Sequence, residues 1–142
     1  MNIPQHYIAL GIIAIGVSGF FMTYQGTPAA VGMAVEQQIK SVPAQAFAEY
    51  IDNDAVVLLD IRTPEEYDGG HIEGAANIDF YAADFDTQLA KLDRDVSYAI
   101  YCRSGNRTGQ TLSKMRKLGF TNVVDLTGGI VTWEQAGKEL VY

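Results

Sequence analysis

The sequence has a single cysteine, Cys102, and only two histidines, His6 and His71. One cysteine cannot form an internal disulfide, so the fold does not depend on an oxidising compartment. The histidines and the thiol lie far apart in the chain and lack the spacing of a zinc site, so we expect no metal. The GxxxxGK(S/T) loop and the GxGxxG fingerprint of nucleotide-binding folds are also absent from the sequence.

Positive charge is scarce as well. The 142 residues include 10 Lys and Arg against 17 Asp and Glu, a net charge of −7. An acidic chain without a basic stripe is a poor candidate for binding nucleic acid, and we expect no such partner. The length suits one domain with a short additional segment and is too small for two ordinary domains.

The first 35 residues contain no Asp, Glu, Lys or Arg, and Tyr7–Tyr24 among them reads YIALGIIAIGVSGFFMTY. A helix over this run would be roughly 27 Å long, close to the hydrocarbon thickness of a bilayer, about 30 Å. We predict a transmembrane anchor or signal segment at 1–25. An uncleaved anchor is favoured because no positive side chain precedes the apolar run. The alternative is cleavage at Gly32-Met33-Ala34 and secretion to the periplasm.

Small residues dominate 26–34, which we predict to be a linker to a domain at 35–142. Lys40 is the first basic residue after the apolar run, and acidic residues surround it. The segment that follows the apolar run therefore lacks the cluster of basic residues that would retain it in the cytoplasm. We expect the domain on the translocated side of the membrane, which is the periplasm in a Gram-negative bacterium.

Short apolar runs alternate with amphipathic segments in the predicted domain. Thr63, Pro64 and Glu66 fit the N-cap, N1 and N3 positions of a helix that begins with a capping box. Alternating strands and helices predict an α/β domain with a mostly parallel sheet. The expected strands are 55–59, 75–78, 96–101 and 122–126. The expected helices are 43–51, a short helical turn after Thr63 that Gly69-Gly70 ends, 80–92, 108–118 and a short one around Trp133. Gly119 is expected to end the helix at 108–118.

Cys102 ends a predicted buried strand, and the six-residue loop Cys102–Arg107 leads into a helix expected to begin near Thr108. Ligands of open α/β sheets gather at this edge. Gly105 and Asn106 tolerate positive φ, so the loop can turn its N–H groups inward. The helix N-terminus and the two loop arginines add positive charge. These features favour thiolate over thiol, and we interpret Cys102 as reactive rather than as a small buried apolar residue.

The distribution of charge supports a reactive thiol. No acidic residue occurs between Val96 and Val124, and this stretch holds five of the ten basic residues: Arg103, Arg107, Lys114, Arg116 and Lys117. The pattern predicts a local attractor for anions. No histidine lies near Cys102 in the sequence, so a Cys–His hydrolase is not favoured.

Three segments together resemble the rhodanese (sulfurtransferase) family: LLDIRTPEEYDGGHIEGAANI at Leu58–Ile78, YCRSGNRT at Tyr101–Thr108 and GFTNVVDLTGGIVTW at Gly119–Trp133. The resemblance covers roughly 35–142 and implies a sheet of about five strands flanked by helices. It also implies that Cys102 is the catalytic nucleophile. By the same resemblance, the donor and the persulfide are expected to be bound by Arg103, Ser104, Gly105, Asn106 and Arg107.

The resemblance implies a ping-pong reaction in which Cys102 takes the outer sulfur of a small anionic donor such as thiosulfate. The persulfide then passes this sulfur to cyanide or a thiol, and a protein acceptor is also compatible. Sulfur itself attacks and leaves, so neither a metal nor an organic cofactor is needed. Asp60 and Arg62 match the family's D-x-R element, and we expect them, with Thr108, to support the loop.

Two other functions are compatible with these residues. Related phosphatases and arsenate reductases have five residues between Cys and Arg, whereas four, Arg103–Asn106, separate Cys102 from Arg107 here. The shorter loop suits a sulfane sulfur better than a phosphoryl or arsenate group. The second alternative is a membrane-tethered sulfur carrier or binding module without turnover of small molecules. The intact Cys102 argues against a module that only docks a partner.

Overall fold

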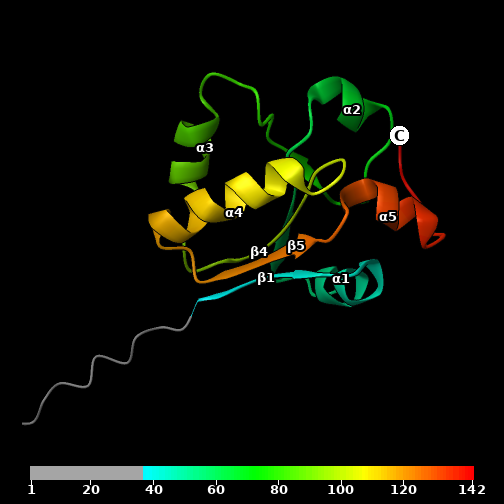
Figure 1. Ribbon diagram of the computed structural model, residues 1–142, viewed down its shortest axis with the longest axis horizontal. Coiled ribbons are helices and arrows are strands. Elements are labelled where there is room, and N and C mark those ends of the chain that lie inside the picture. Colours follow the sequence, from blue (N-terminus) through cyan, green and yellow to red (C-terminus); the bar gives the residue numbers. More distant parts are fainter. Residues whose placement is uncertain (1–36) are drawn as a thin grey trace, which may run out of the picture. The chain divides into compact units, whose positions relative to one another are not determined.

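The computed structural model describes residues 37–142. In this part of the chain, five strands form one sheet in the order β1-β5-β4-β2-β3, and every neighbouring pair is parallel. The predicted parallel α/β fold is therefore confirmed. β4 lies in the centre of the sheet, and Cys102 directly follows its carboxyl end. The turn after β4 leads into α4 (Figure 1). The strands are β1 (Gln38–Val42), β2 (Val56–Asp60), β3 (Ala76–Asn77), β4 (Ser97–Tyr101) and β5 (Asn122–Leu126).

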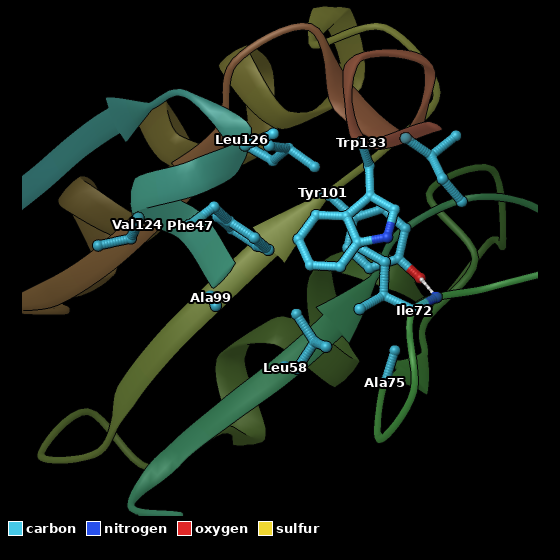
Figure 2. Close-up of a cluster of buried hydrophobic side chains, with 11 residues drawn as sticks. Phe47, Leu58, Ile72, Ala75, Ala99, Tyr101, Val124, Leu126 and Trp133 are labelled. Atoms are coloured by element: carbon cyan, nitrogen blue, oxygen red, sulfur yellow. Dashed lines mark hydrogen bonds between the residues drawn. The ribbon is translucent and has the colours of Figure 1, made fainter. Parts of the chain in front are cut away.

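Helices cover both faces of the sheet. They are α1 (Ala44–Ile51), α2 (Pro64–Asp68), α3 (Phe85–Lys91), α4 (Asn106–Leu118) and α5 (Gly129–Gln135). One core cluster joins α1 and α5 to the sheet. In Figure 2, Trp133 of α5 lies close to Phe47 of α1, and their rings meet edge to face with centroids 6.3 Å apart. The second cluster joins α3 and α4 to the opposite face and includes Cys102. The thiol thus belongs to the face that α4 covers.

Local signals placed several elements correctly. Thr63 Oγ1 accepts from Glu66 N, and Glu66 Oε2 accepts from Thr63 N, so the predicted capping box begins α2. β5 has the predicted bounds, and Gly119 ends α4 with φ 87°. The edge strand β1 was missed, because it pairs only with β5 and has just two half-buried residues, Ile39 and Val42.

Two helix starts differ from the prediction. The helix expected at 80–92 begins only at Phe85, because Asp79 forms a turn by accepting hydrogen bonds from Tyr81 N and Ala82 N. The helix expected near Thr108 begins two residues earlier, at Asn106. Asn106 and Arg107 are consequently in the first turn of α4, and the true loop after β4 is shorter than expected.

None of the helices in residues 37–142 is long and apolar enough to cross a membrane. The apolar run Tyr7–Tyr24 and the linker at 26–34 lie outside the described residues, so the anchor or signal segment stays a prediction.

Candidate active site

Cys102 is buried, with 1% of its surface exposed, at the carboxyl end of the central strand. Gly105 N donates to its sulfur over 3.1 Å, and Thr108 Oγ1 lies 3.8 Å from the same atom. Gly105 has φ 96° and is the N-cap of the 13-residue helix α4. The sulfur thus lies at a helix N-terminus, where amide and dipole favour negative charge. The predicted inward turn is made by Gly105, whereas Asn106 is helical.

Backbone hydrogen bonds from α5 hold the turn after Cys102 in place. Ile130 N donates to Cys102 O over 2.9 Å, and Val131 N donates to Arg103 O over 3.3 Å. Gly129 packs so closely that a Cβ built on it would lie 2.4 Å from Cys102 O. From the sequence we expected only a short helix around Trp133, but the contacts of Gly129, Ile130 and Val131 at its start fix the backbone of the thiol loop.

A pocket of about 600 Å³ opens over this loop. It brings together four of the five predicted donor-binding residues, Arg103, Ser104, Asn106 and Arg107, while Gly105 contributes its N–H to the sulfur. The other lining residues, Glu66, Phe80, Tyr81 and Gln110, were not predicted to belong to the site. Tyr81 is 67% exposed, which is unusual for so large an aromatic residue.

Arg107 is held by Glu66 in the wall of this pocket. Arg107 Nη1 lies 2.6 Å from Glu66 Oε2, and Nη2 lies 2.8 Å from Oε1. The hydrogen bonds from Arg107 lower the pKa of Glu66 from 4.5 to about 2, against the opposing effect of burial. The same carboxylate caps α2 through Thr63, so the capping role predicted for Glu66 is real but incomplete.

The three-dimensional charge pattern differs from the pattern along the chain. Although Val96 to Val124 contains no acid, other segments supply Glu66 to Arg107 and Asp86 to Lys114 as ion-pair partners. Among the described residues, Arg103 makes no ion pair, and its side chain is exposed in the pocket wall. Arg103 is therefore the pocket residue whose positive charge is not neutralised by a carboxylate of the described residues.

Asp60, the last residue of β2, forms a buried ion pair with Arg62. Arg62 Nη2 lies 2.6 Å from Asp60 Oδ2, and both side chains are at most 6% exposed. The guanidinium also donates to Gly70 O over 2.8 Å and lies over the ring of Tyr101, 5.6 Å from its centroid. The pair thus reaches the loop through Tyr101, the residue before Cys102. Thr108, the third predicted support, donates to Gly105 O over 3.0 Å.

A parallel five-stranded sheet with a thiol beneath an arginine-bearing turn defines a rhodanese-like domain. The sequence profile of the rhodanese-like domain family matches residues 43–136, and the chain belongs to this family. The predicted resemblance is therefore confirmed at the level of the family.

Individual relatives show the same likeness. Thiosulfate sulfurtransferase GlpE of Pseudomonas entomophila is 34% identical over 92 residues, which cover 64% of this chain and 80% of that protein. The probable adenylyltransferase/sulfurtransferase MoeZ of Mycobacterium tuberculosis is 40% identical over 55% of this chain, which matches only 20% of MoeZ. The crystal structure of a rhodanese-related protein from Thermoplasma volcanium has a TM-score of 0.64 and 32% identity, covering 72% of this chain and 97% of that one.

Proposed function

We propose that this protein is a sulfurtransferase that carries a sulfane sulfur as a persulfide on Cys102. The observation that carries the proposal is the position of Sγ: it accepts the Gly105 N–H at the N-terminus of α4, and the residues that follow Cys102, among them Arg103, line the pocket. An amide, a helix dipole and a cationic side chain all stabilise a sulfur anion there. Family membership and the likeness to a thiosulfate sulfurtransferase support the same chemistry.

The proposed reaction has two displacement steps on sulfur. The Cys102 thiolate attacks the outer sulfur of thiosulfate, the sulfur–sulfur bond of the donor breaks, and sulfite leaves with the bonding electron pair. Cyanide or a thiolate then attacks the terminal sulfur of the persulfide, and the Cys102 thiolate is the leaving group. Atoms and electrons balance using donor and acceptor alone, so no metal or cofactor enters the proposal.

We assign the pocket residues to the donor. Arg103 attracts and holds the anion, and Arg107 borders the same space from the first turn of α4. Ser104 and Asn106 offer neutral polar groups to the oxygens of a sulfonate-like donor. The loop backbone that carries the pocket residues is supported by Asp60, Arg62 and Thr108.

Mass spectrometry tests the nucleophile. After treatment with thiosulfate, the wild-type chain should gain one sulfur atom on Cys102, and thiosulfate:cyanide turnover should be measurable. Cys102→Ser should lose both while keeping the circular dichroism spectrum and unfolding midpoint of a folded domain. Sulfur loading by a folded Cys102→Ser variant would refute the assignment.

The same protein should fail to hydrolyse p-nitrophenyl phosphate. The turn between Cys102 and Arg107 has four residues, and Arg107 is already occupied by Glu66 on both of its terminal nitrogens. Phosphatase turnover that exceeds sulfur transfer would favour the phosphatase and arsenate reductase alternative instead.

One observation favours a protein as the physiological acceptor. Tyr81 is 67% exposed at the edge of the pocket, beside Phe80. Exposed aromatic residues next to a reactive centre are typical of surfaces that contact another protein. In that case Cys102 should load sulfur normally but turn over slowly with small acceptors, whereas rapid turnover with cyanide and simple thiols would favour the small-molecule enzyme.

A further inference from the structure

The pocket lined by the turn after Cys102 also has aromatic residues that a reaction with thiosulfate does not use. Phe80 and Tyr81 reach it from the turn between β3 and α3. Its volume of about 600 Å³ falls within the range of about 300–1,000 Å³ that is typical of pockets for drug-sized ligands. Thiosulfate is much smaller than such ligands and has no apolar part. The pocket therefore has both room and apolar surface for a further part of the donor.

The two aromatic rings are held in place by their neighbours. Tyr81 N donates to Asp79 Oδ1 over 2.9 Å, which fixes the turn that carries both rings. The Phe80 ring packs against Phe85 of α3, with centroids 5.2 Å apart, and against Tyr81, at 5.3 Å. The guanidinium carbon of Arg107 lies 5.6 Å from the centroid of the Tyr81 ring. Tyr81 is still 67% exposed, so a positioned ring offers most of its surface to a ligand.

The charges of the pocket match a donor with one negative charge. Arg107 is paired with Glu66 through two hydrogen bonds of 2.6 and 2.8 Å. Arg103 makes no ion pair with the described residues, so one uncompensated cation lines the pocket. Thiosulfate is a dianion, and its second charge meets the Glu66 carboxylate in the pocket wall instead of a free cation. Replacing one oxygen of thiosulfate by carbon removes that charge and adds an apolar part.

We propose that the preferred sulfur donor is a monoanion with an organic group on the sulfur that leaves, either a thiosulfonate or a persulfide that carries one carboxylate. Its anionic group pairs with Arg103, and its organic group lies against Tyr81 and Phe80. The inference rests on the proposed function for the transfer to Cys102. In a ping-pong reaction the acceptor enters after the donor has left, so a ring that contacts the donor is afterwards presented to the acceptor.

The transfer balances with the donor alone. The Cys102 thiolate attacks the outer sulfur of a thiosulfonate, the bond between the two sulfurs breaks, and a sulfinate leaves with the bonding electron pair. With a protonated organic persulfide, the same attack releases a thiolate, and the proton of the outer sulfur stays on the Cys102 persulfide. Both reactions are thiol exchanges on sulfur, so neither consumes an external oxidant or reductant.

Thiosulfonates of equal charge test the contact with Tyr81. The full chain is mixed with benzenethiosulfonate or methanethiosulfonate without an acceptor, and persulfide formation on Cys102 is followed by mass spectrometry. Relative to the same two reactions with free cysteine, loading should favour benzenethiosulfonate. Tyr81→Ala should lower the ratio of the two loading rates about three- to tenfold, the range of one aromatic contact. The intrinsic reactivities of the donors cancel in this comparison between variants.

Two further variants control for the ring and for its place. Tyr81→Phe keeps the ring and should keep the wild-type ratio. Tyr142→Ala removes a tyrosine that is 89% exposed and does not line the pocket, so the ratio should not change. Urea unfolding midpoints establish that each variant is folded. If Tyr81→Ala keeps the wild-type ratio, or Tyr142→Ala lowers the ratio as much, the contact with the organic group does not exist.

The persulfide of para-(mercaptomethyl)benzoate gives the second arm, because its leaving group is a thiol instead of a sulfinate. Loading that depends on Tyr81 with only one of the two donor classes identifies the leaving group, and loading that depends on Tyr81 with neither class overturns the inference. Glu66→Gln tests the charge: it should raise loading from thiosulfate several-fold more than loading from methanethiosulfonate. Equal effects on both donors would contradict the match to a monoanion.

An unreactive anion separates this inference from the proposed function. Benzenesulfonate should bind more tightly than methanesulfonate in calorimetry, and Tyr81→Ala should remove most of the difference. If that preference is found but no donor loads sulfur, the proposed function fails and the organic-anion site remains. If thiosulfate loads sulfur and neither loading nor sulfonate binding depends on Tyr81, the proposed function remains and this inference fails.

Discussion

Glu66 and Arg107 join the first turn of α2 to the first turn of α4 through two hydrogen bonds, 2.6 and 2.8 Å long, in the wall of the pocket. Arg107 is only 11% exposed, so its charge is largely committed to this carboxylate. A parallel pair of bonds between guanidinium and carboxylate is strong and fixes the orientation of both groups. The pair therefore connects α2 to α4, and it also reduces the positive charge that Arg107 presents to a donor in the pocket.

The first prediction concerns stability against pH. Hydrogen bonding from Arg107 depresses the pKa of Glu66 from 4.5 to about 2 in the folded state. A depressed pKa stabilises the fold above the unfolded value and loses this contribution as the pH falls through the folded value. Urea unfolding should show wild type more stable than Glu66→Gln by about 1–2 kcal/mol at pH 7, with the gap shrinking from about pH 4.5 toward about pH 2.

Glutamine can still serve as the N3 residue of the capping box, so Glu66→Gln isolates the ion pair from the cap. Glu65→Gln provides the control, because Glu65 is the exposed neighbour in the same helix turn. A gap that stays constant from pH 7 to pH 3 would show that the ion pair contributes nothing.

The second prediction concerns the donor. Glu66→Gln removes a negative charge from the pocket and frees Arg107, so the KM for thiosulfate should fall several-fold, while Glu65→Gln changes it little. Arg107→Ala leaves Glu66 unpaired in the pocket wall and should raise the KM roughly tenfold or more. Lys117→Ala, about 15 Å along α4 from Arg107, should have a smaller effect. Equal effects of the two cation removals would mean that diffuse charge handles the donor.

The Glu66–Arg107 pair also shows where sequence reasoning reaches its limit. The α2 capping box was predictable because its atoms lie three positions apart, and the Gly119 stop depends on one residue. Glu66 and Arg107 are 41 positions apart, so their contact depends on how two loops meet above the sheet. The thiol and four pocket residues were predictable because they lie within six consecutive positions of the sequence, whereas Phe80 and Tyr81 come from a turn without a distinctive pattern.

The third prediction concerns the buried ion pair of Asp60 and Arg62 at the carboxyl end of β2. Asp60 is fully buried, so replacing it by Asn leaves the charge of Arg62 without its partner in the interior. Such a change should cost about 3–5 kcal/mol of unfolding free energy. In a double-mutant cycle with Arg62→Met, the double variant should be less destabilised than the sum of the single variants. Additive losses would indicate that the two side chains do not interact.

The fourth prediction concerns the apolar run at Tyr7–Tyr24. If it anchors the chain, the intact protein should sediment with membranes, and a C-terminal reporter after Tyr142 should be active only on the translocated side. N-terminal sequencing distinguishes the two alternatives: a cleaved signal gives a soluble chain that begins near Val35. Reporter activity confined to the cytoplasm would contradict the predicted orientation.

The fifth prediction concerns Gly129, whose φ is 64°. An added Cβ would lie 2.4 Å from Cys102 O and 2.5 Å from Arg103 O, so Gly129→Ala must displace the turn that holds the sulfur. Gly137 is a matched control, since it has φ 70° but no atom within 4 Å of an added Cβ. Gly137→Ala should cost only about 1–2 kcal/mol of backbone strain and keep sulfur loading.

Gly129→Ala should lose more stability than Gly137→Ala, and it should load sulfur from thiosulfate at least tenfold more slowly even where urea titration shows it fully folded. The reason is that Ile130 N and Val131 N bond to the carbonyls of Cys102 and Arg103, so moving α5 moves the backbone of the loop. If Gly129→Ala loads sulfur at the rate of Gly137→Ala, the position of the sulfur does not depend on α5, and α4 alone sets it.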